Sequence, residues 1–187
     1  MPPPPCPPAV AATAAIALGA NLGRPADTLA AVRPRLEALI AAWRPEALLW
    51  SPQFRTAPVG GPAQPDYLNA ALLIRWPEPP AGLARARDLL AGLQALETAF
   101  GRERGVRWGP RSLDLDLLWF GACTSSEPAL QLPHPRLARR SFVLAPLAAI
   151  DPGLSLPDGR SAALALAALP REPSPPQRLP GSRGWPE

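Results

Sequence analysis

Apolar residues recur along the middle of the chain with two different spacings. A period of two predicts a strand, and apolar residues every three or four positions predict a helix. The segment over about 80–100 shows the helical period, because its leucines fall at that spacing and Gly101 follows as a stop signal. In chain order, we expect a strand over about 13–19, a helix over 25–43, strands over 46–56 and 67–76, a helix over 80–100, and a strand over 112–120.

This order of elements predicts an α+β fold. We expect a ferredoxin-like βαββαβ sandwich, in which a mostly antiparallel sheet carries both helices on one face and leaves the other face free to bind. A short hairpin partner near 128–132, a loop at Pro133-His134-Pro135 and short helical segments up to about 168 follow as extra C-terminal elements. Pro34 lies inside the first expected helix and should kink or shorten it.

Proline-rich segments flank this pattern at both ends. Residues 1–11 and 170–187 hold many prolines and few residues that could build a core, so we expect disordered tails there. Residues 12–169 suit one domain with a well-formed core. The Ala-rich run over 10–20 is short and follows prolines instead of a positively charged start, so we expect neither a signal peptide nor a membrane-spanning segment.

Composition excludes several chemistries. All 19 basic residues are arginine, which excludes mechanisms that need a lysine, such as the Walker P-loop and Schiff-base catalysis. The pI of about 10.3 accompanies a net charge of only +4, so it does not by itself indicate nucleic-acid binding. Cys6 and Cys123 have neither the spacing of a zinc site nor the density of a disulfide scaffold, so we expect a reducing, cytoplasmic location.

The segment with the most chemical character joins the second expected helix to the last expected strand. Residues 101–111 place four arginines and Trp108 among three glycines, and Asp114 and Asp116 follow inside an apolar strand. Because side chains alternate along a strand, both carboxylates point to one face. Two close carboxylates raise each other's pKa unless a cation lies beside them, and Mg²⁺ would serve. Arginines beside such a metal favour phosphate chemistry.

Three other interpretations stay open from these residues alone. The aspartates could lie on the solvated face of an ordinary amphipathic strand, although Asp is depleted in strands. A ferredoxin-like sheet could bind RNA, although no run in the sequence resembles the aromatic RNA-binding motif, and the acids would repel a phosphate backbone without metals. The same pair could also activate water in a metal-dependent phosphohydrolase.

Several segments together resemble the 6-hydroxymethyl-7,8-dihydropterin pyrophosphokinase family. They keep the family's order and spacing from about residue 13 to 160, and the most specific is Trp-Gly-Pro-Arg-Ser-Leu-Asp-Leu-Asp over 108–116. The resemblance implies that a pyrophosphoryl group passes from MgATP to the hydroxymethyl oxygen of the pterin in folate biosynthesis, with release of AMP. The other matching segments are 17–23, 54–56, 65–70, 96–97 with 101–102, and 133–136.

The resemblance also implies roles for single residues. Arg102, Arg111, Asp114 and Asp116 match catalytic positions, and the two aspartates match the ligands of two Mg²⁺ ions. Arg104 and Trp108 match a loop that closes over the substrates. Positions matching ATP contacts are Gln94, Glu97, Arg102, Arg111, His134 and Arg140, and positions matching pterin contacts are Thr56, Val59, Tyr67, Asn69, Trp108 and Phe142.

Some of these residues have an ordinary structural interpretation as well. Tyr67 could be a core residue and Asn69 a turn former at a strand edge, since aromatic residues in strands usually pack. A structural role is the default for His134 in its proline-flanked loop, and Glu97 could simply pair with an arginine. The partners implied are ATP and 6-hydroxymethyl-7,8-dihydropterin; we expect no nucleic acid, no membrane and a monomeric protein.

Overall fold

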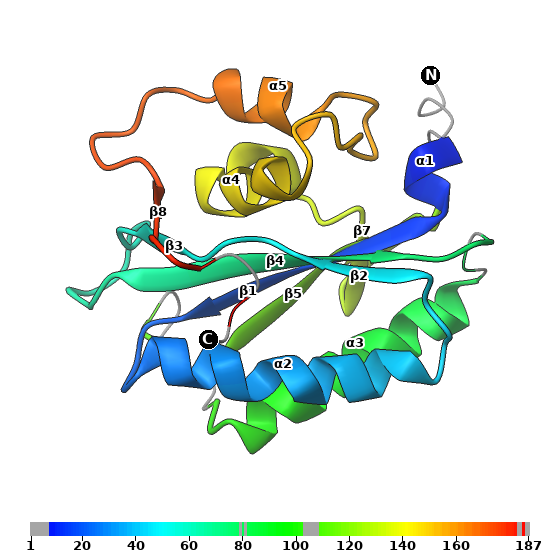
Figure 1. The fold of residues 1–187 in the computed structure, drawn as a ribbon, viewed down its shortest axis with the longest axis horizontal. Coiled ribbons are helices and arrows are strands. Elements are labelled where there is room, and N and C mark those ends of the chain that lie inside the picture. The colour runs from blue at the N-terminus through cyan, green and yellow to red at the C-terminus, as the bar shows by residue number, and fades with distance from the viewer. Residues whose placement is uncertain (1–7, 79, 81, 103–108, 183–184, 186–187) are drawn as a thin grey trace.

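The computed structural model describes residues 8–78, 80, 82–102, 109–182 and 185. A central antiparallel sheet lies between two layers of helices (Figure 1). Its strand order is β5-β1-β4-β3-β8, and β2 pairs with β4 on the same side as β3. The strands are β1 (Thr13–Ala20), β2 (Ala47–Trp50), β3 (Phe54–Thr56), β4 (Tyr67–Arg75), β5 (Asp114–Phe120) and β8 (Gln177–Arg178).

The expected ferredoxin-like α+β class is confirmed. Helices α2 (Pro25–Ala41) and α3 (Leu83–Ala99) connect the strands in the βαββαβ order. We expected Pro34 to kink or shorten this helix. Helix α2 instead continues past Pro34 to Ala41, so Pro34 does not end it. The C-terminal part adds η1 (Leu137–Arg139), α4 (Ser141–Ile150) and α5 (Ala162–Ala167).

The single strand expected over 46–56 is two strands in the structure. Pro52 lies between β2 and β3, where it cannot donate a hydrogen bond to the sheet. The side chain of Ser51 replaces the regular backbone partner there, because its Oγ accepts the N–H of Ala71 at 2.8 Å. The hairpin expected near 128–132 is also different: β7 (Leu130–Leu132) pairs with β6 (Ser125–Glu127) in a separate two-stranded sheet.

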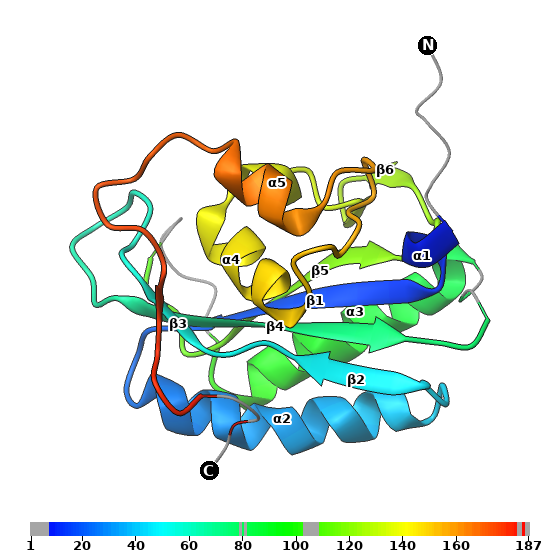
Figure 2. The ribbon, with the colours of Figure 1, turned by 45° about the horizontal axis from the view of Figure 1, so that its top comes forward.

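Both faces of the sheet are covered, so the expectation of a free second face is wrong. Figure 2 shows α2 and α3 below the sheet and α4 and α5 above it. Helix α4 is apolar over most of its length, and Val143, Leu144 and Leu147 pack with Leu73 and Trp119 of the sheet. The strands are apolar on both faces, which is why the sheet accepts helices on each side. The candidate site lies on the α4 face, at the end where β5 begins.

The described residues near both ends of the chain contain regular elements, whereas composition predicts disordered tails there. Residues 1–7 lie outside the described residues, but α1 (Pro8–Ala11) precedes β1, and Val10 is buried. At the other end, β8 pairs with β3, and Trp185 is only 3% exposed. The prolines of this segment suit an extended strand at a sheet edge, and Trp185 supplies the apolar surface that the segment otherwise lacks.

No helix among the described residues has both the length and the apolar character needed to cross a membrane.

Candidate active site

The sheet register brings the predicted metal ligands and the predicted pterin contacts onto one face. Asp114 on β5 lies opposite Gly19 on β1, and Gly19 lies opposite Asn69 on β4. Residues that face each other across antiparallel strands project to the same side of the sheet. Strands are spaced by about 4.8 Å, so Asp114 and Asn69 are separated by roughly 10 Å across β1. Asp116 lies on the same face, opposite Ala17.

Asp114 lies between two arginines. Its Oδ1 is 2.8 Å from Nη2 of Arg102, and its Oδ2 is 2.5 Å from Nη1 of Arg111. Oδ1 is buried and makes no hydrogen bond of good geometry with any residue that the structure describes. Oδ1 of Asp114 is therefore close to the charge of Arg102 but does not form a well-aligned hydrogen bond with it.

Asp116 has a different set of neighbours from elements that follow β5. Its Oδ2 is 3.2 Å from Nη1 of Arg140, at the start of α4, and 4.0 Å from Nε2 of His134. Burial, followed by the charge of Asp114, raises the pKa of Asp116, while His134 and Arg140 oppose that rise. The two carboxylates thus repel each other, as their common face predicts. Arg102 and Arg111 partly neutralise Asp114, and Arg140 partly neutralises Asp116.

Burial lowers the pKa of His134, although the charge of Asp116 acts in the opposite direction. Nearby Arg140 and Arg136 lower the pKa of His134 further. The neutral ring is therefore the favoured form at neutral pH. Its Nδ1 accepts the backbone N–H of Arg136 at 3.1 Å, which leaves the proton of the neutral ring on Nε2, the nitrogen nearer Asp116.

Glu97 links the end of α3 to the start of β5. It is 5% exposed, accepts the backbone N–H of Leu115 at 2.7 Å, and forms an ion pair with Arg102. Burial raises the pKa of Glu97, while the hydrogen bonds from Arg102 and from the Leu115 N–H lower it. Glu97 thereby holds the guanidinium of Arg102 beside Asp114.

The donor set suits Mg²⁺ that arrives with a phosphate ligand. Within the described part of the chain, no third His, Cys, Asp or Glu joins the pair in a metal-binding cluster. Mg²⁺ is usually held by one or two carboxylates together with substrate phosphates and water, so Asp114 and Asp116 fit this requirement. Oδ1 of Asp114 is buried and has an ion-pair contact with Arg102 but no hydrogen bond of good geometry with any described residue, so it is an acceptor that such an ion would use.

The predicted pterin contacts form a second group at the β3 side of the site. Asn69 and Thr56 are both buried, and Nδ2 of Asn69 donates to Oγ1 of Thr56 at 2.6 Å. The Tyr67 hydroxyl lies 3.1 Å from the carbonyl oxygen of Gly109 and donates to it, and burial raises the pKa of this hydroxyl. The ring of Phe142, on α4, lies 5.4 Å from the guanidinium carbon of Arg140.

Two predicted residues, Gln94 and Val59, are not part of this arrangement. Gln94 is exposed on α3, one turn before Glu97, and Val59 is 72% exposed in the loop after β3. Arg104 and Trp108 lie outside the described residues, so their predicted place in a closing loop is untested by the structure.

Asn21 is a polar residue of the site whose part the sequence analysis missed. It is 3% exposed, and its Oδ1 accepts the backbone N–H of Arg111 at 2.8 Å. Its Nδ2 donates to Oε1 of Gln64 and to the carbonyl of Pro65, each at 3.0 Å. The available signal was the position of Asn21, a polar residue directly after an apolar strand and two residues before Gly23. From the sequence alone, this pattern indicated only a turn.

Comparison with known proteins finds similar sequences over most of the chain. Residues 15–152 match the family described as 7,8-dihydro-6-hydroxymethylpterin-pyrophosphokinase. A Pseudomonas aeruginosa protein named 2-amino-4-hydroxy-6-hydroxymethyldihydropteridine pyrophosphokinase is 41% identical over 169 residues, which cover 89% of this chain and 96% of that protein. Proteins of the same name from Mycobacterium tuberculosis (39% identical, 83% of this chain and 77% of the relative) and Haemophilus influenzae (36% identical, 79% and 87%) are also similar. The chain therefore belongs to the 7,8-dihydro-6-hydroxymethylpterin-pyrophosphokinase family.

Proposed function

We propose that this protein transfers a pyrophosphoryl group from MgATP to the hydroxymethyl oxygen of 6-hydroxymethyl-7,8-dihydropterin, giving AMP and the pterin diphosphate for folate biosynthesis. One observation carries the proposal. Two carboxylates, each paired with an arginine, share a sheet face with the buried amide of Asn69, two strands away. A metal–phosphate site and a site for a flat polar ring therefore lie beside each other.

The arginines bind the phosphates. Arg102 and Arg111 pair with Asp114 in the ligand-free protein, and each guanidinium can turn its donors from the carboxylate to phosphate oxygens. When bound, two Mg²⁺ ions held by Asp114 and Asp116 supply neutralisation of the triphosphate and an in-line orientation at the β-phosphorus. The fixed positive charges then stabilise the negative charge that develops on the leaving α-phosphate.

Residues around Asp116 complete the phosphate side. Arg140 adds a third cation at the start of α4. Neutral His134 carries a proton on Nε2, so this nitrogen can donate a hydrogen bond to a phosphate oxygen without adding charge. Glu97 does not contact the phosphates in this proposal; it keeps Arg102 in position from behind.

The pterin binds on the β3 side. Donation from Asn69 to Thr56 fixes the orientation of the amide, which leaves Oδ1 of Asn69 as an acceptor for ring N–H groups. Tyr67 and Phe142 provide aromatic faces for the flat ring. The backbone near Val59, in the loop after β3, adds a further contact. Arg104 and Trp108 close over both substrates and exclude water, so that ATP is not hydrolysed. A monomeric state and a cytoplasmic location stay predictions from the sequence.

Product analysis tests the proposal. The purified protein is incubated with MgATP, with and without 6-hydroxymethyl-7,8-dihydropterin, and nucleotides and pterins are separated by chromatography. We expect AMP and the pterin diphosphate in equal amounts, and almost no AMP when the pterin is omitted. Release of free phosphate that does not depend on the pterin would instead indicate a phosphohydrolase and would overturn the proposal.

A further inference from the structure

We infer that the C-terminal strap, defined as residues 177–182 together with Trp185, is a positioning element for the pterin-binding strand β3. The inference rests on the proposed function of the Asn69–Thr56 group. Strand β3 is only three residues long, and β8 of the strap is its partner on the side away from β4. Phe54 pairs with Arg178, and Arg55 pairs with Gln177. The strap thus forms the edge of the sheet next to the proposed pterin site.

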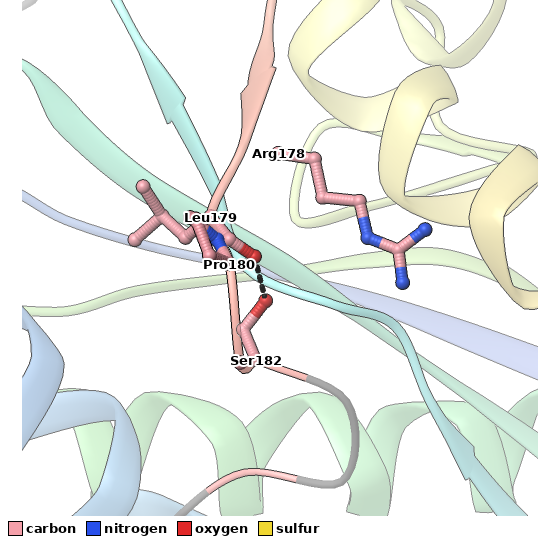
Figure 3. Close-up of a pocket in the computed structure, with 5 residues that line it drawn as sticks. Arg178, Leu179, Pro180 and Ser182 are labelled. Atoms are coloured by element: carbon pink, nitrogen blue, oxygen red, sulfur yellow. Dashed lines mark hydrogen bonds between the residues drawn. The ribbon is translucent and has the colours of Figure 1, made fainter.

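The strap also binds the irregular segment that leads into β3. The N–H of Leu179 donates to the carbonyl of Gln53 at 2.9 Å, and the N–H of Gln53 donates to Oγ of Ser182 at 3.1 Å. Figure 3 shows Ser182 turned back toward Leu179, whose carbonyl accepts its hydroxyl at 2.8 Å. Both backbone groups of Gln53 are therefore satisfied by residues more than 120 positions later in the sequence.

Trp185 anchors the end of the strap. Its Nε1 donates to the carbonyl of Ser51 at 2.7 Å, and its ring meets the ring of Trp50 edge to face, with centroids 5.2 Å apart. The guanidinium carbon of Arg33, on α2, lies 4.9 Å from the Trp50 ring and 5.7 Å from the Trp185 ring. Glu37 accepts from Arg33 and from the indole of Trp50, so the anchor is fixed to α2 as well as to the sheet.

These contacts matter for the pterin because β3 is held by only two of the described strands, β4 on one side and β8 of the strap on the other. Pro52 interrupts the sheet just before β3, and segments without sheet partners open readily. Thr56, the last residue of β3, accepts from Asn69, so a shift of β3 would move the acceptor that orients the pterin-binding amide. The family match ends at residue 152, so the strap is a support that lies beyond the matched segment.

Two tryptophans allow a matched test. Trp185→Phe keeps an aromatic ring but removes the indole N–H that bonds Ser51. Trp76→Phe is the control: Trp76 is also buried, and its Nε1 also donates to a backbone carbonyl, that of Trp43 at 3.1 Å, but it follows the opposite end of β4. We expect W185F to raise the KM for the pterin about fivefold while kcat and the KM for ATP change less than twofold, a loss comparable to one buried hydrogen bond. W76F should leave all three values within twofold of wild type.

A second variant and a second readout keep the inference separate from the proposed function. Ser182→Ala removes the acceptor for Gln53 without touching the aromatic anchor, and it should raise the pterin KM in the same way. Hydrogen exchange should become faster at the amides of residues 53–56 in W185F but not in W76F, whether or not the wild type makes AMP. The inference would be overturned if exchange at residues 53–56 were unchanged in W185F. It would also be overturned if the pterin KM and the ATP KM rose, and kcat fell, by the same factor. Failure of the wild type to form AMP would overturn the proposed function instead.

Discussion

Gly19 leaves the space in which the Asn69 side chain lies. The two residues face each other between β1 and β4, and a Cβ atom on Gly19 would lie 2.9 Å from Oδ1 of Asn69. Such a contact is too short for a carbon and an oxygen, so the amide would have to turn or shift. A glycine inside a strand often marks a close approach of this kind. Gly19 therefore determines where the amide of Asn69, the proposed pterin contact, can lie.

Replacing Gly19 with alanine should weaken pterin binding selectively. We expect the Kd for the pterin to rise about tenfold, because a displaced buried polar group costs on the order of 1–3 kcal/mol. MgATP binding should change less than about twofold, since the arginines and aspartates keep their own contacts. Gly153→Ala is a suitable control, because a Cβ atom there would meet only Asp151 Oδ1 at 3.4 Å. Calorimetric titration measures both affinities, and an unchanged pterin Kd in G19A would contradict this account.

The arginine pairs of Asp114 predict that metal binding at the proposed site depends on the nucleotide. Arg102 and Arg111 hold the carboxylate in the ligand-free protein, so Mg²⁺ alone must compete with two cations. Phosphates draw the guanidinium groups away and supply further oxygen ligands. We therefore expect Mg²⁺ to bind at least about tenfold more tightly with a non-hydrolysable ATP analogue than without it, which is a coupling of about 1.4 kcal/mol or more. Equal Mg²⁺ affinity in both titrations would refute the coupling.

Replacing Asp114 with alanine tests the same pairs from the protein side. We expect turnover to fall at least about a hundredfold, because the variant lacks a ligand for the metal that orients the phosphates. Considered only as one of two like charges on a strand face, Asp114 could be removed with relief of repulsion and no loss of stability. The structure changes this expectation, since D114A would leave Arg102 and Arg111 beside each other without the carboxylate between them. Urea unfolding should show a loss of about 1 kcal/mol or more.

The raised pKa of Glu97 predicts a pH dependence of stability. Because its pKa in the folded state lies above the ordinary value of 4.5, the fold favours the protonated form. This carboxylate therefore contributes more stability as the pH falls through the folded pKa, and it costs stability at higher pH. Glu97→Gln stays neutral and keeps an acceptor for Leu115. Relative to wild type, this variant should therefore be more stable at pH 8 than at pH 5. The opposite trend in urea titrations would disprove the assignment.

Local patterns were enough to predict most elements of the sheet and their order. Apolar runs bounded by turn and loop residues identified β1, β4 and β5, and helical spacing identified α3, because each of these segments buries apolar side chains in the core. The interruption at Pro52 and the covered second face were missed for physical reasons. The interruption at Pro52 depends on the hydrogen bond between Ser51 and Ala71, and the covered face depends on where α4 packs. Neither contact is local in the sequence.

The same limit applies to the candidate site. The spacing of Asp114 and Asp116 within one strand was sufficient to place both on one face, because strand geometry fixes it. The proline-rich composition of residues 170–187 pointed to disorder, yet Trp185 gains its hydrogen bond and ring contacts from a segment 134 residues earlier. Composition indicates how much apolar surface a segment can bury by itself. It does not show that Trp185 is buried against a distant segment that contains Trp50 and Ser51.

Asn21 connects the phosphate side to the pterin side. Its amide accepts the backbone N–H of Arg111, and it donates to the Gln64–Pro65 segment just before Tyr67. The N–H groups of Asn21 and Leu22 also donate to the carbonyl of Arg111, at 3.0 and 3.3 Å. Three segments distant in sequence are thus joined at one buried side chain.

Substitution of Asn21 should therefore affect both substrates together. Asn21→Ala removes all of these side-chain hydrogen bonds, so the N–H of Arg111 and the carbonyl of Pro65 lose their partner, at a cost of about 1 kcal/mol or more in stability. We expect the KM values for ATP and pterin to rise together, in contrast to the selective effects of G19A and W185F. Asn21→Asp separates the two sides, because it keeps an acceptor for Arg111 but can no longer donate to Gln64 and Pro65. The ATP KM of N21D should then stay closer to wild type than its pterin KM. Equal losses in both KM values for N21D would show that the two sides are not supported by separate atoms of this side chain.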